Sequence, residues 1–127
     1  MPLVRVSVPQ QLTEAQVRHI SESIHQSMVA TFNVPQDDRF QVVSRHKPEE
    51  IVCTPAYLGI AHTERVAFIQ ITCNEGRTLE MKKALFAALA RSIAEGGAVL
   101  ASDVIVSLVE VKKENWSFGN GMAQYAT

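Results

Sequence analysis

The sequence that begins at residue 3 recurs, without a gap, from residue 68, an offset of 65 residues. This internal repeat limits the fold more than any other feature. Residues 3–8 read Leu-Val-Arg-Val-Ser-Val, and residues 68–73 read Phe-Ile-Gln-Ile-Thr-Cys. Both stretches alternate their apolar side chains in the way that half-buried strands do. Thr13 and Thr78 fall at matching positions, each where the N-cap of a helix is expected. The repeat therefore predicts that one structural unit occurs twice.

Each copy continues into a helix with one apolar stripe. The first helix is predicted over Glu14–Phe32, where apolar side chains recur at steps of three and four residues. The second is predicted over Leu79–Glu95 on the same pattern, and the pair Gly96-Gly97 ends it. A second strand follows in each copy, at residues 40–43 and at residues 105–108. These stripes indicate core packing and not a cofactor-binding motif.

The two units, at about residues 2–44 and 67–109, define the fold class. A strand–helix–strand connection is right-handed and makes its two strands parallel, so we predict one α+β domain, residues 1–127, built from tandem β-α-β repeats. Its four strands form one mixed sheet, and both helices cover a single face of that sheet. The other face, which we expect to be largely apolar, needs a partner, because large exposed apolar patches are rare in monomers. The sequence therefore also predicts an oligomer.

Two segments lie outside the repeats. Residues 45–64 are predicted to form a long loop with a turn around Tyr57-Leu58-Gly59. The C-terminal tail, residues 112–127, is rich in turn-forming residues and carries three aromatic side chains, Trp116, Phe118 and Tyr125. A short tail with this many aromatic residues is seldom disordered, so we expect it to pack on the domain or on a neighbouring subunit.

Composition places the chain among ordinary single-domain globular proteins. Its 127 residues suffice for a core, and 12 basic and 13 acidic side chains give a formal net charge of −1. Such a balance lacks the excess of positive charge that would favour binding to nucleic acid or to an anionic membrane. No apolar stretch reaches the ~18–20 residues of a membrane span, and residues 1–20 lack the continuous apolar run of a secretory signal. We therefore expect a cytoplasmic protein.

The residues that commonly bind metals have no ligand spacing here. Cys53 and Cys73 lie far apart in the sequence, and the four histidines follow no metal-binding pattern. We expect both cysteines to behave as small, half-buried hydrophobic residues in a reducing compartment. The sequence thus predicts neither a metal ion nor a cofactor.

The residue after Met1 is a proline, and aminopeptidases usually remove a methionine that precedes such a residue. The mature chain would then begin with the secondary amine of Pro2 on the first residue of a strand. Apolar surroundings and a nearby cation both favour the neutral form of an amine, and a neutral amine can abstract a proton next to a carbonyl group. The alternative is that Pro2 merely starts a strand, where its missing N–H costs nothing.

Three motifs carry a resemblance to a known family. They are Met1-Pro2-Leu3, the stretch Phe32–Phe40 (Phe-Asn-Val-Pro-Gln-Asp-Asp-Arg-Phe), and the stretch Glu114–Gly121 (Glu-Asn-Trp-Ser-Phe-Gly-Asn-Gly). With the doubled strand–helix–strand unit, they make the chain similar to the tautomerase superfamily over nearly its whole length. The resemblance is closest to the long-chain group that contains malonate semialdehyde decarboxylase.

The resemblance implies a cofactor-independent homotrimer that acts on a small carboxylate substrate, with its active sites near subunit boundaries. It implies that the Pro2 nitrogen is the catalytic group, that Asp38 positions or activates water, and that Arg77 binds the substrate carboxylate. A second family arginine corresponds to Glu75 in this chain, which reverses the charge at a substrate-binding position. The resemblance also implies an aromatic wall around the site, formed by Trp116, Phe118 and Tyr125.

The residues themselves leave alternatives open. Asp38 has the repeat mate Asp103, and both precede a strand, so each could serve only in a turn or a cap. Arg77 could be an ordinary solvated residue before a helix, and Arg39 could pair with a surface carboxylate. Trp116 and its aromatic neighbours in the tail could be plain packing.

Three functions therefore compete. The first is a tautomerase-type isomerase that uses Pro2 as general base on small 2-oxo acids or their enols, with hydration of an unsaturated acid as an added activity. The second is malonate semialdehyde decarboxylase, a lyase, which the loss of an arginine at Glu75 disfavours. The third is a non-enzymatic trimeric binding protein, because a fold does not guarantee a chemistry. Retention of Met1 would favour the third, since the Pro2 nitrogen would then be an amide.

Overall fold

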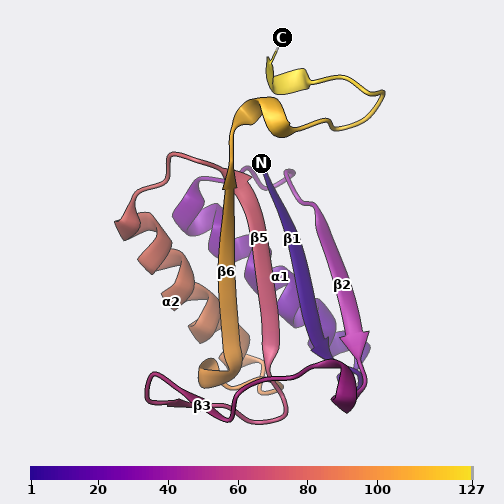
Figure 1. Ribbon diagram of the computed structural model, residues 1–127, viewed down its shortest axis with the longest axis vertical. Helices are drawn as coiled ribbons and strands as arrows, with labels where there is room; N and C mark the ends of the chain where they lie inside the picture. Colours follow the sequence, from indigo (N-terminus) through magenta and orange to yellow (C-terminus); the bar gives the residue numbers. More distant parts are fainter. Residues whose placement is uncertain (127) are drawn as a thin grey trace.

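The computed structural model describes residues 1–126, so the last residue of the predicted tail, Thr127, lies outside the described residues. A four-stranded sheet is the centre of the molecule, in the order β2-β1-β5-β6 (Figure 1). Its strands are β1 (Pro2–Pro9), β2 (Gln41–His46), β5 (Ala67–Asn74) and β6 (Val104–Val111). The β1–β2 and β5–β6 pairs are parallel, whereas β1 and β5 are antiparallel. The predicted mixed sheet and α+β class are confirmed.

Two helices cover one face of this sheet, as predicted (Figure 1). They are α1 (Glu14–Phe32) and α2 (Leu79–Glu95), with the bounds that the sequence predicts. The Thr13 hydroxyl accepts the backbone N–H of Gln16, whose side chain in turn accepts the Thr13 N–H, completing a capping box. Thr78 caps α2 with its hydroxyl in the same way. Neither helix of the described chain is long and apolar enough to cross a membrane.

The core lies between the helices and the inner face of the sheet. Alternate residues of the two central strands point inward and are buried: Val4, Val6, Val8, Ala67, Ile69, Ile71 and Cys73. The helices meet them with their apolar stripes, chiefly Ile20, Ile24, Met28, Leu85, Leu89 and Ile93. Burial of a side chain of this kind stabilises the fold by roughly 1.5–3 kcal/mol. The apolar positions of the strands and of the helices therefore stabilise the same core.

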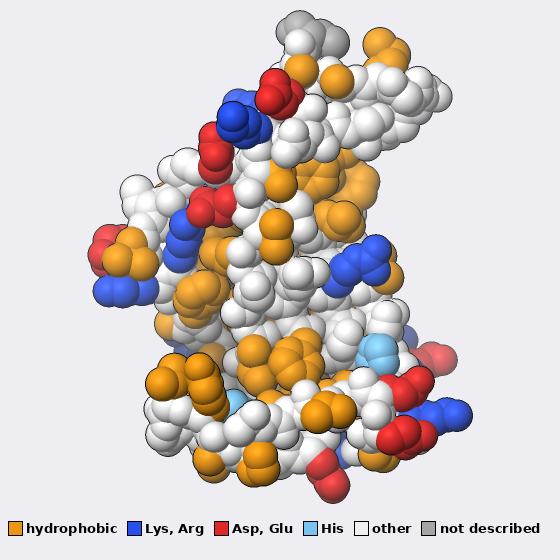
Figure 2. Space-filling model, in the orientation of Figure 1, with side chains coloured by type: hydrophobic (Ala, Val, Ile, Leu, Met, Phe, Trp, Pro, Cys, Tyr) orange, Lys and Arg blue, Asp and Glu red, His pale blue; other side chains and the backbone are white. Residues whose placement is uncertain are grey.

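The outer face of the sheet carries no helix, and it is less apolar than expected. It carries apolar side chains such as Leu3 and Phe68 together with polar ones such as Arg5 and Gln70. Figure 2 shows this side of the molecule, where hydrophobic side chains form separate patches with polar groups between them. The outward positions of β1 and β5 are thus mixed, because Leu3 and Phe68 are each followed by polar residues at the next outward positions of their strands.

The segment between the repeats is more ordered than a plain loop. Strand β2 continues to His46, so the connection starts two residues later than predicted, because β1 extends to Pro9 and pairs with it. The expected turn is present: β3 (Ala56–Tyr57) and β4 (Ile60–Ala61) form a small hairpin. Its turn residues have positive φ angles, 50° at Leu58 and 80° at Gly59, as a two-residue hairpin turn requires.

Candidate active site

One end of the sheet brings together the segments that the sequence analysis singled out. Because β1 and β5 are antiparallel, the start of β1 lies beside the end of β5, and Pro2 is opposite Cys73. The backbone N–H of Val4 donates to the Phe40 carbonyl, which draws the segment before β2 to the same end. Strand β6 also ends here, and the tail leaves from it above the N-terminus (Figure 1). The topology alone therefore places Pro2 and the tail at one edge.

The chain's amino group lies next to Asp38 at this edge. The Met1 nitrogen is 3.6 Å from Asp38 Oδ2, and the aspartate side chain is only 18% exposed. The other carboxylate oxygen, Oδ1, is buried and has no hydrogen-bond partner among the described residues. In this form the charged amine belongs to Met1, and the Pro2 nitrogen is an amide that cannot act as a base.

A cavity of about 270 Å³ opens beside this ion pair. Its lining residues are Met1, Asp37, Asp38, Phe40, Phe118 and Tyr125. Burial raises the pKa of the Tyr125 phenol, and the negative charge of Asp38 raises it further. Both causes disfavour the phenolate, so the phenol is a hydrogen-bond donor at neutral pH. The cavity therefore combines an amine, a carboxylate and aromatic walls.

The tail aromatics form one cluster on the domain, which confirms the expectation that the tail is packed. The Phe118 ring stacks on Trp116 with centroids 5.5 Å apart and meets Tyr125 edge-on at 5.1 Å. It also lies 6.1 Å from the Phe40 ring. The Trp116 indole N–H donates to the side-chain oxygen of Asn74 at 2.7 Å, which fastens the tail to the end of β5. Phe118 and Tyr125 thus line the cavity, whereas Trp116, which was predicted to do so as well, stacks on Phe118 and is not among the described lining residues.

Arg77 lies at the same edge but is not among the described residues that line the cavity. Its Nη1 donates to the Asn74 carbonyl and its Nη2 to the Phe32 carbonyl, both at 3.2 Å. The guanidinium also sits 4.9 Å above the Phe32 ring centroid, within cation–π range. Two of the five guanidinium N–H groups are thus committed to backbone carbonyls. The neighbouring Cys73 thiol has its pKa raised by burial, an effect that the charge of Arg77 opposes.

A second cavity of about 670 Å³ lies beside the first on the side of Glu75. Its lining residues are Asn74, Glu75, Val111, Lys112, Lys113, Glu114, Tyr125 and Ala126. Tyr125 borders both cavities, so the two are neighbours across one side chain. The charges around the second cavity are mixed, with two lysines and two glutamates, and Glu75 itself is exposed.

The repeat mates Asp38 and Asp103 have different surroundings. Asp103 is fully buried, and its carboxylate accepts the backbone N–H of Thr63 at 2.9 Å and the Thr63 hydroxyl at 2.5 Å. It therefore tethers the long connection across 40 residues of sequence, which is neither the turn nor the cap role that the alternative named. Asp38 instead faces the amine. Among the described residues, no group of three or more His, Cys, Asp or Glu side chains could hold a metal ion.

Three residues of this edge were not singled out from the sequence. Asp37 and Phe40 line the cavity. Asn74 accepts hydrogen bonds from both Trp116 and Arg77, with its side-chain oxygen and its backbone carbonyl respectively. The sequence could have indicated Phe40 as a site residue, since it is an aromatic residue two positions after Asp38 and directly before β2. No sequence pattern identifies Asn74 as a site residue, because polar residues are common at the ends of strands.

Comparisons with known proteins agree with this architecture. Two family models described as tautomerase enzyme match residues 38–119 and residues 2–60. The probable tautomerase YusQ of Bacillus subtilis (strain 168) is 38% identical over 124 residues, which is 98% of each chain. The crystal structure of FG41 malonate semialdehyde decarboxylase inhibited by 3-bromopropiolate is 36% identical with a TM-score of 0.90, over 97% of this chain and 93% of that one.

A further solved structure has the same shape. It is a malonate semialdehyde decarboxylase whose structures are described as a basis for decarboxylase and hydratase activities. It is 32% identical to this chain with a TM-score of 0.88, over 97% of this chain and 95% of that one. With a family model that matches more than half of the chain and a relative 38% identical along nearly its whole length, the chain belongs to the tautomerase family.

Proposed function

We propose that this protein is a cofactor-independent tautomerase in which the amine of Pro2, freed by removal of Met1, acts as general base on small 2-oxo acids or their enols. The observation that carries the proposal is the position of the chain's amine, 3.6 Å from Asp38 at an aromatic-walled cavity. Loss of Met1 moves the amine by one residue, to the first residue of β1, at the same edge of the sheet.

The reaction needs only proton transfers. The neutral Pro2 amine takes a proton from the carbon next to the carbonyl group, and the C–H electron pair moves to form the enolate. The resulting ammonium then returns a proton to oxygen, or to carbon in the reverse direction, so that no atom is gained or lost. A positioned base of this kind contributes roughly 10²–10⁴-fold to the rate.

Arg77 and Asp38 complete the proposed site. The guanidinium N–H groups of Arg77 that are not committed to carbonyls can bind the substrate carboxylate or the developing enolate oxygen. Asp38 Oδ1, which has no partner among the described residues, can accept a proton from water and align it. Addition of that water to an unsaturated acid would be the hydratase activity.

Decarboxylation of malonate semialdehyde is the second candidate, and the likeness to two such decarboxylases favours it. Glu75 argues against it. One charge-assisted hydrogen bond contributes about 1.5–3 kcal/mol, or roughly ten- to 150-fold, and a glutamate at this position adds repulsion toward a carboxylate. We therefore rank this activity below tautomerisation.

We also propose a homotrimer, as the family resemblance implies. The outer face of the sheet supports this proposal, because neither helix covers it (Figure 1) and it carries apolar patches (Figure 2). Burial of that face would place the start of each β1 near a subunit boundary. Sedimentation velocity of the purified protein tests the assembly, and a monomer at micromolar concentration would refute it.

The decisive experiment couples intact mass to activity. The protein without Met1 is mixed with the enol of phenylpyruvate, and ketonisation is followed by loss of ultraviolet absorbance. We expect a rate above that of buffer, a loss of at least about 10²-fold in Pro2→Ala, and activity in proportion to the fraction of chains that lack Met1. Equal rates in Pro2→Ala and the parent would refute the general-base role, and no rate with any enol would favour a binding protein.

Arg77→Ala tests the carboxylate role. We expect KM for a 2-oxo acid to rise far more than KM for an uncharged ketone of the same size, because only the acid loses a charge-assisted partner. Equal changes for both compounds would remove Arg77 from that role. Malonate semialdehyde and 3-haloacrylates, assayed side by side with the enol, rank the lyase and hydratase activities.

A further inference from the structure

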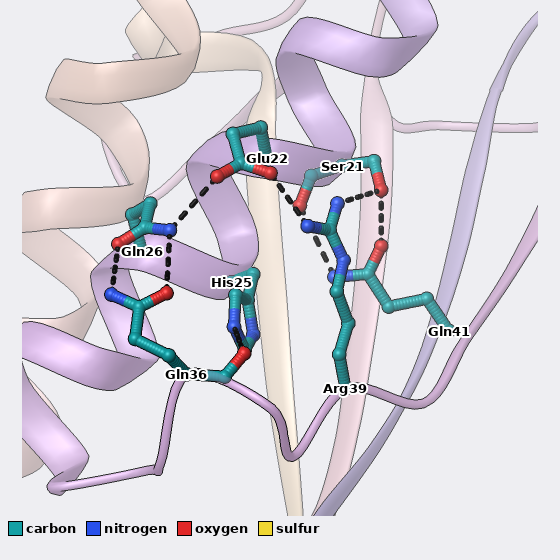
Figure 3. Close-up of polar contacts among 7 residues, drawn as sticks. All are labelled: Ser21, Glu22, His25, Gln26, Gln36, Arg39 and Gln41. Carbon is teal, nitrogen blue, oxygen red and sulfur yellow. Dashed lines mark hydrogen bonds and ion pairs between the residues drawn. The ribbon is translucent and has the colours of Figure 1, made fainter.

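The turn that carries Asp38 is fixed to helix α1 by a buried histidine. His25 lies on α1, is only 1% exposed, and has its Nε2 2.8 Å from the backbone carbonyl of Gln36. In Figure 3 the imidazole ring points from the helix to this carbonyl. Gln36 precedes Asp38 by two residues, so the contact reaches the segment that brings the carboxylate to the amine.

The hydrogen bond assigns the protonation of the ring. A carbonyl oxygen only accepts hydrogen bonds, so Nε2 carries the proton and donates it. The other nitrogen, Nδ1, is buried and has no partner among the described residues. His25 therefore donates one hydrogen bond, and that bond is made to the Asp38 turn.

The turn itself is short and is held at two points. The Asp38 backbone N–H donates to the Pro35 carbonyl at 3.0 Å, which closes the turn. His25 holds the Gln36 carbonyl inside that turn. A turn closed by one bond and anchored by another leaves little freedom to the aspartate, whose Oδ2 lies 3.6 Å from the amine.

Other contacts between α1 and this segment lie at the surface (Figure 3). The side-chain amides of Gln26 and Gln36 bond to each other twice, at 3.0 and 3.1 Å. Arg39 pairs with Glu22 at 2.5 Å, as the surface-carboxylate alternative for this arginine anticipated. Hydrogen bonds from Gln26 and Arg39 lower the pKa of Glu22. Exposed pairs of this kind contribute little, so the bond from the buried His25 is the stronger anchor.

We propose that His25 is a positioning residue: it acts through the Gln36 carbonyl to hold the Asp38 carboxylate beside the chain's amine. The kinetic side of this inference rests on the proposed function, whereas the structural side does not. A histidine that served only to fill the core would be replaced by leucine with no effect on the turn. The two roles therefore predict different results.

The first measurement is hydrogen exchange followed by mass spectrometry on the peptide that contains Asp38. His25→Leu removes the donor, and we expect exchange of the turn amides to accelerate about five- to tenfold, as for loss of one net hydrogen bond. His25→Gln is the matched control, because its side-chain N–H₂ stands where the imidazole Nε2 stands, and we expect exchange within twofold of the parent. Unchanged exchange in His25→Leu would overturn the inference.

The second measurement is a double-mutant cycle on ketonisation. We expect His25→Leu to lower kcat about tenfold with KM unchanged, and His25→Gln to restore it. In an Asp38→Asn background the leucine variant should cause no further loss, because coupled residues are not additive. An equal loss in both backgrounds would overturn the inference. If the parent protein shows no turnover, the proposed function fails and the exchange experiment alone decides the role of His25.

Discussion

The two repeat-mate aspartates should differ in what their removal does. Asp103 is fully buried and accepts two hydrogen bonds from Thr63, while Asp38 is partly exposed and pairs with an amine at 3.6 Å. We therefore expect Asp103→Ala to destabilise the fold without acting directly on the chemistry. Asp38→Ala should do the reverse, with little change in stability and a loss of activity.

The magnitudes follow from these contacts. A hydrogen bond to a charged group contributes a net of about 1.5–3 kcal/mol, and Thr63 is exposed enough for water to replace part of that. Two such bonds give a loss of about 3 kcal/mol for Asp103→Ala. Thr63→Val removes only the hydroxyl donor and should cost about half as much. For Asp38→Ala we expect less than about 1 kcal/mol, as for a partly exposed ion pair.

Guanidinium chloride unfolding, followed by far-ultraviolet circular dichroism, measures these differences. All variants must be compared at one protein concentration, because assembly adds to apparent stability, and their m-values must agree for the midpoints to be comparable. A free energy of unfolding for Asp103→Ala within about 0.5 kcal/mol of the parent would refute the claim that the bonds from Thr63 to Asp103 stabilise the fold. An equally large loss in Asp38→Ala would refute the assignment of Asp38 to the site.

Three further outcomes are expected. Asp38→Asn should lower the pKa of Tyr125 toward its ordinary value, because the carboxylate charge that disfavours the phenolate is gone; absorbance at ~295 nm during alkaline titration measures this, and an unmoved curve would contradict it. Cys53 should react with a thiol reagent before the buried Cys73, whose raised pKa and burial both slow it; mass mapping that found Cys73 modified first would contradict this. Thr78→Ala should lower the free energy of unfolding by about 1 kcal/mol through loss of the α2 cap, and denaturation with no shift would show that the cap is dispensable.

Most of the fold could be predicted from the sequence, because the helix caps and the apolar patterns indicate the same elements. The capping threonines and the apolar stripes set both helices at their observed bounds. The character of the outer sheet face was harder to predict, since residues such as Arg5 and Gln70 interrupt it. The β3–β4 hairpin appeared in the sequence only as a turn, because strands of two residues each carry too little pattern to be recognised.

The resemblance indicated residues that the structure brings to one edge, but it did not indicate their contacts. The resemblance indicated Arg77 and the tail aromatics, and the structure places them at one edge. It could not indicate that the arginine is bonded to two backbone carbonyls, because that depends on the position of Phe32 at the end of α1. The buried bond from His25 to Gln36 was equally hidden, since a histidine within an apolar stripe resembles any other core residue.

The two repeats differ at the end where Pro2 and its repeat mate lie. The repeat mate of Pro2 is Ala67, which lies within the chain, so its nitrogen is an amide and cannot become a base. The connection that leads into Ala67 crosses the corresponding end of the second unit, where Thr63 bonds to Asp103. In the first unit the cavity that Met1 and Asp38 line lies at the corresponding end. The same residue therefore has different partners at two equivalent positions: Asp103 accepts hydrogen bonds from Thr63, whereas Asp38 lies beside the amine.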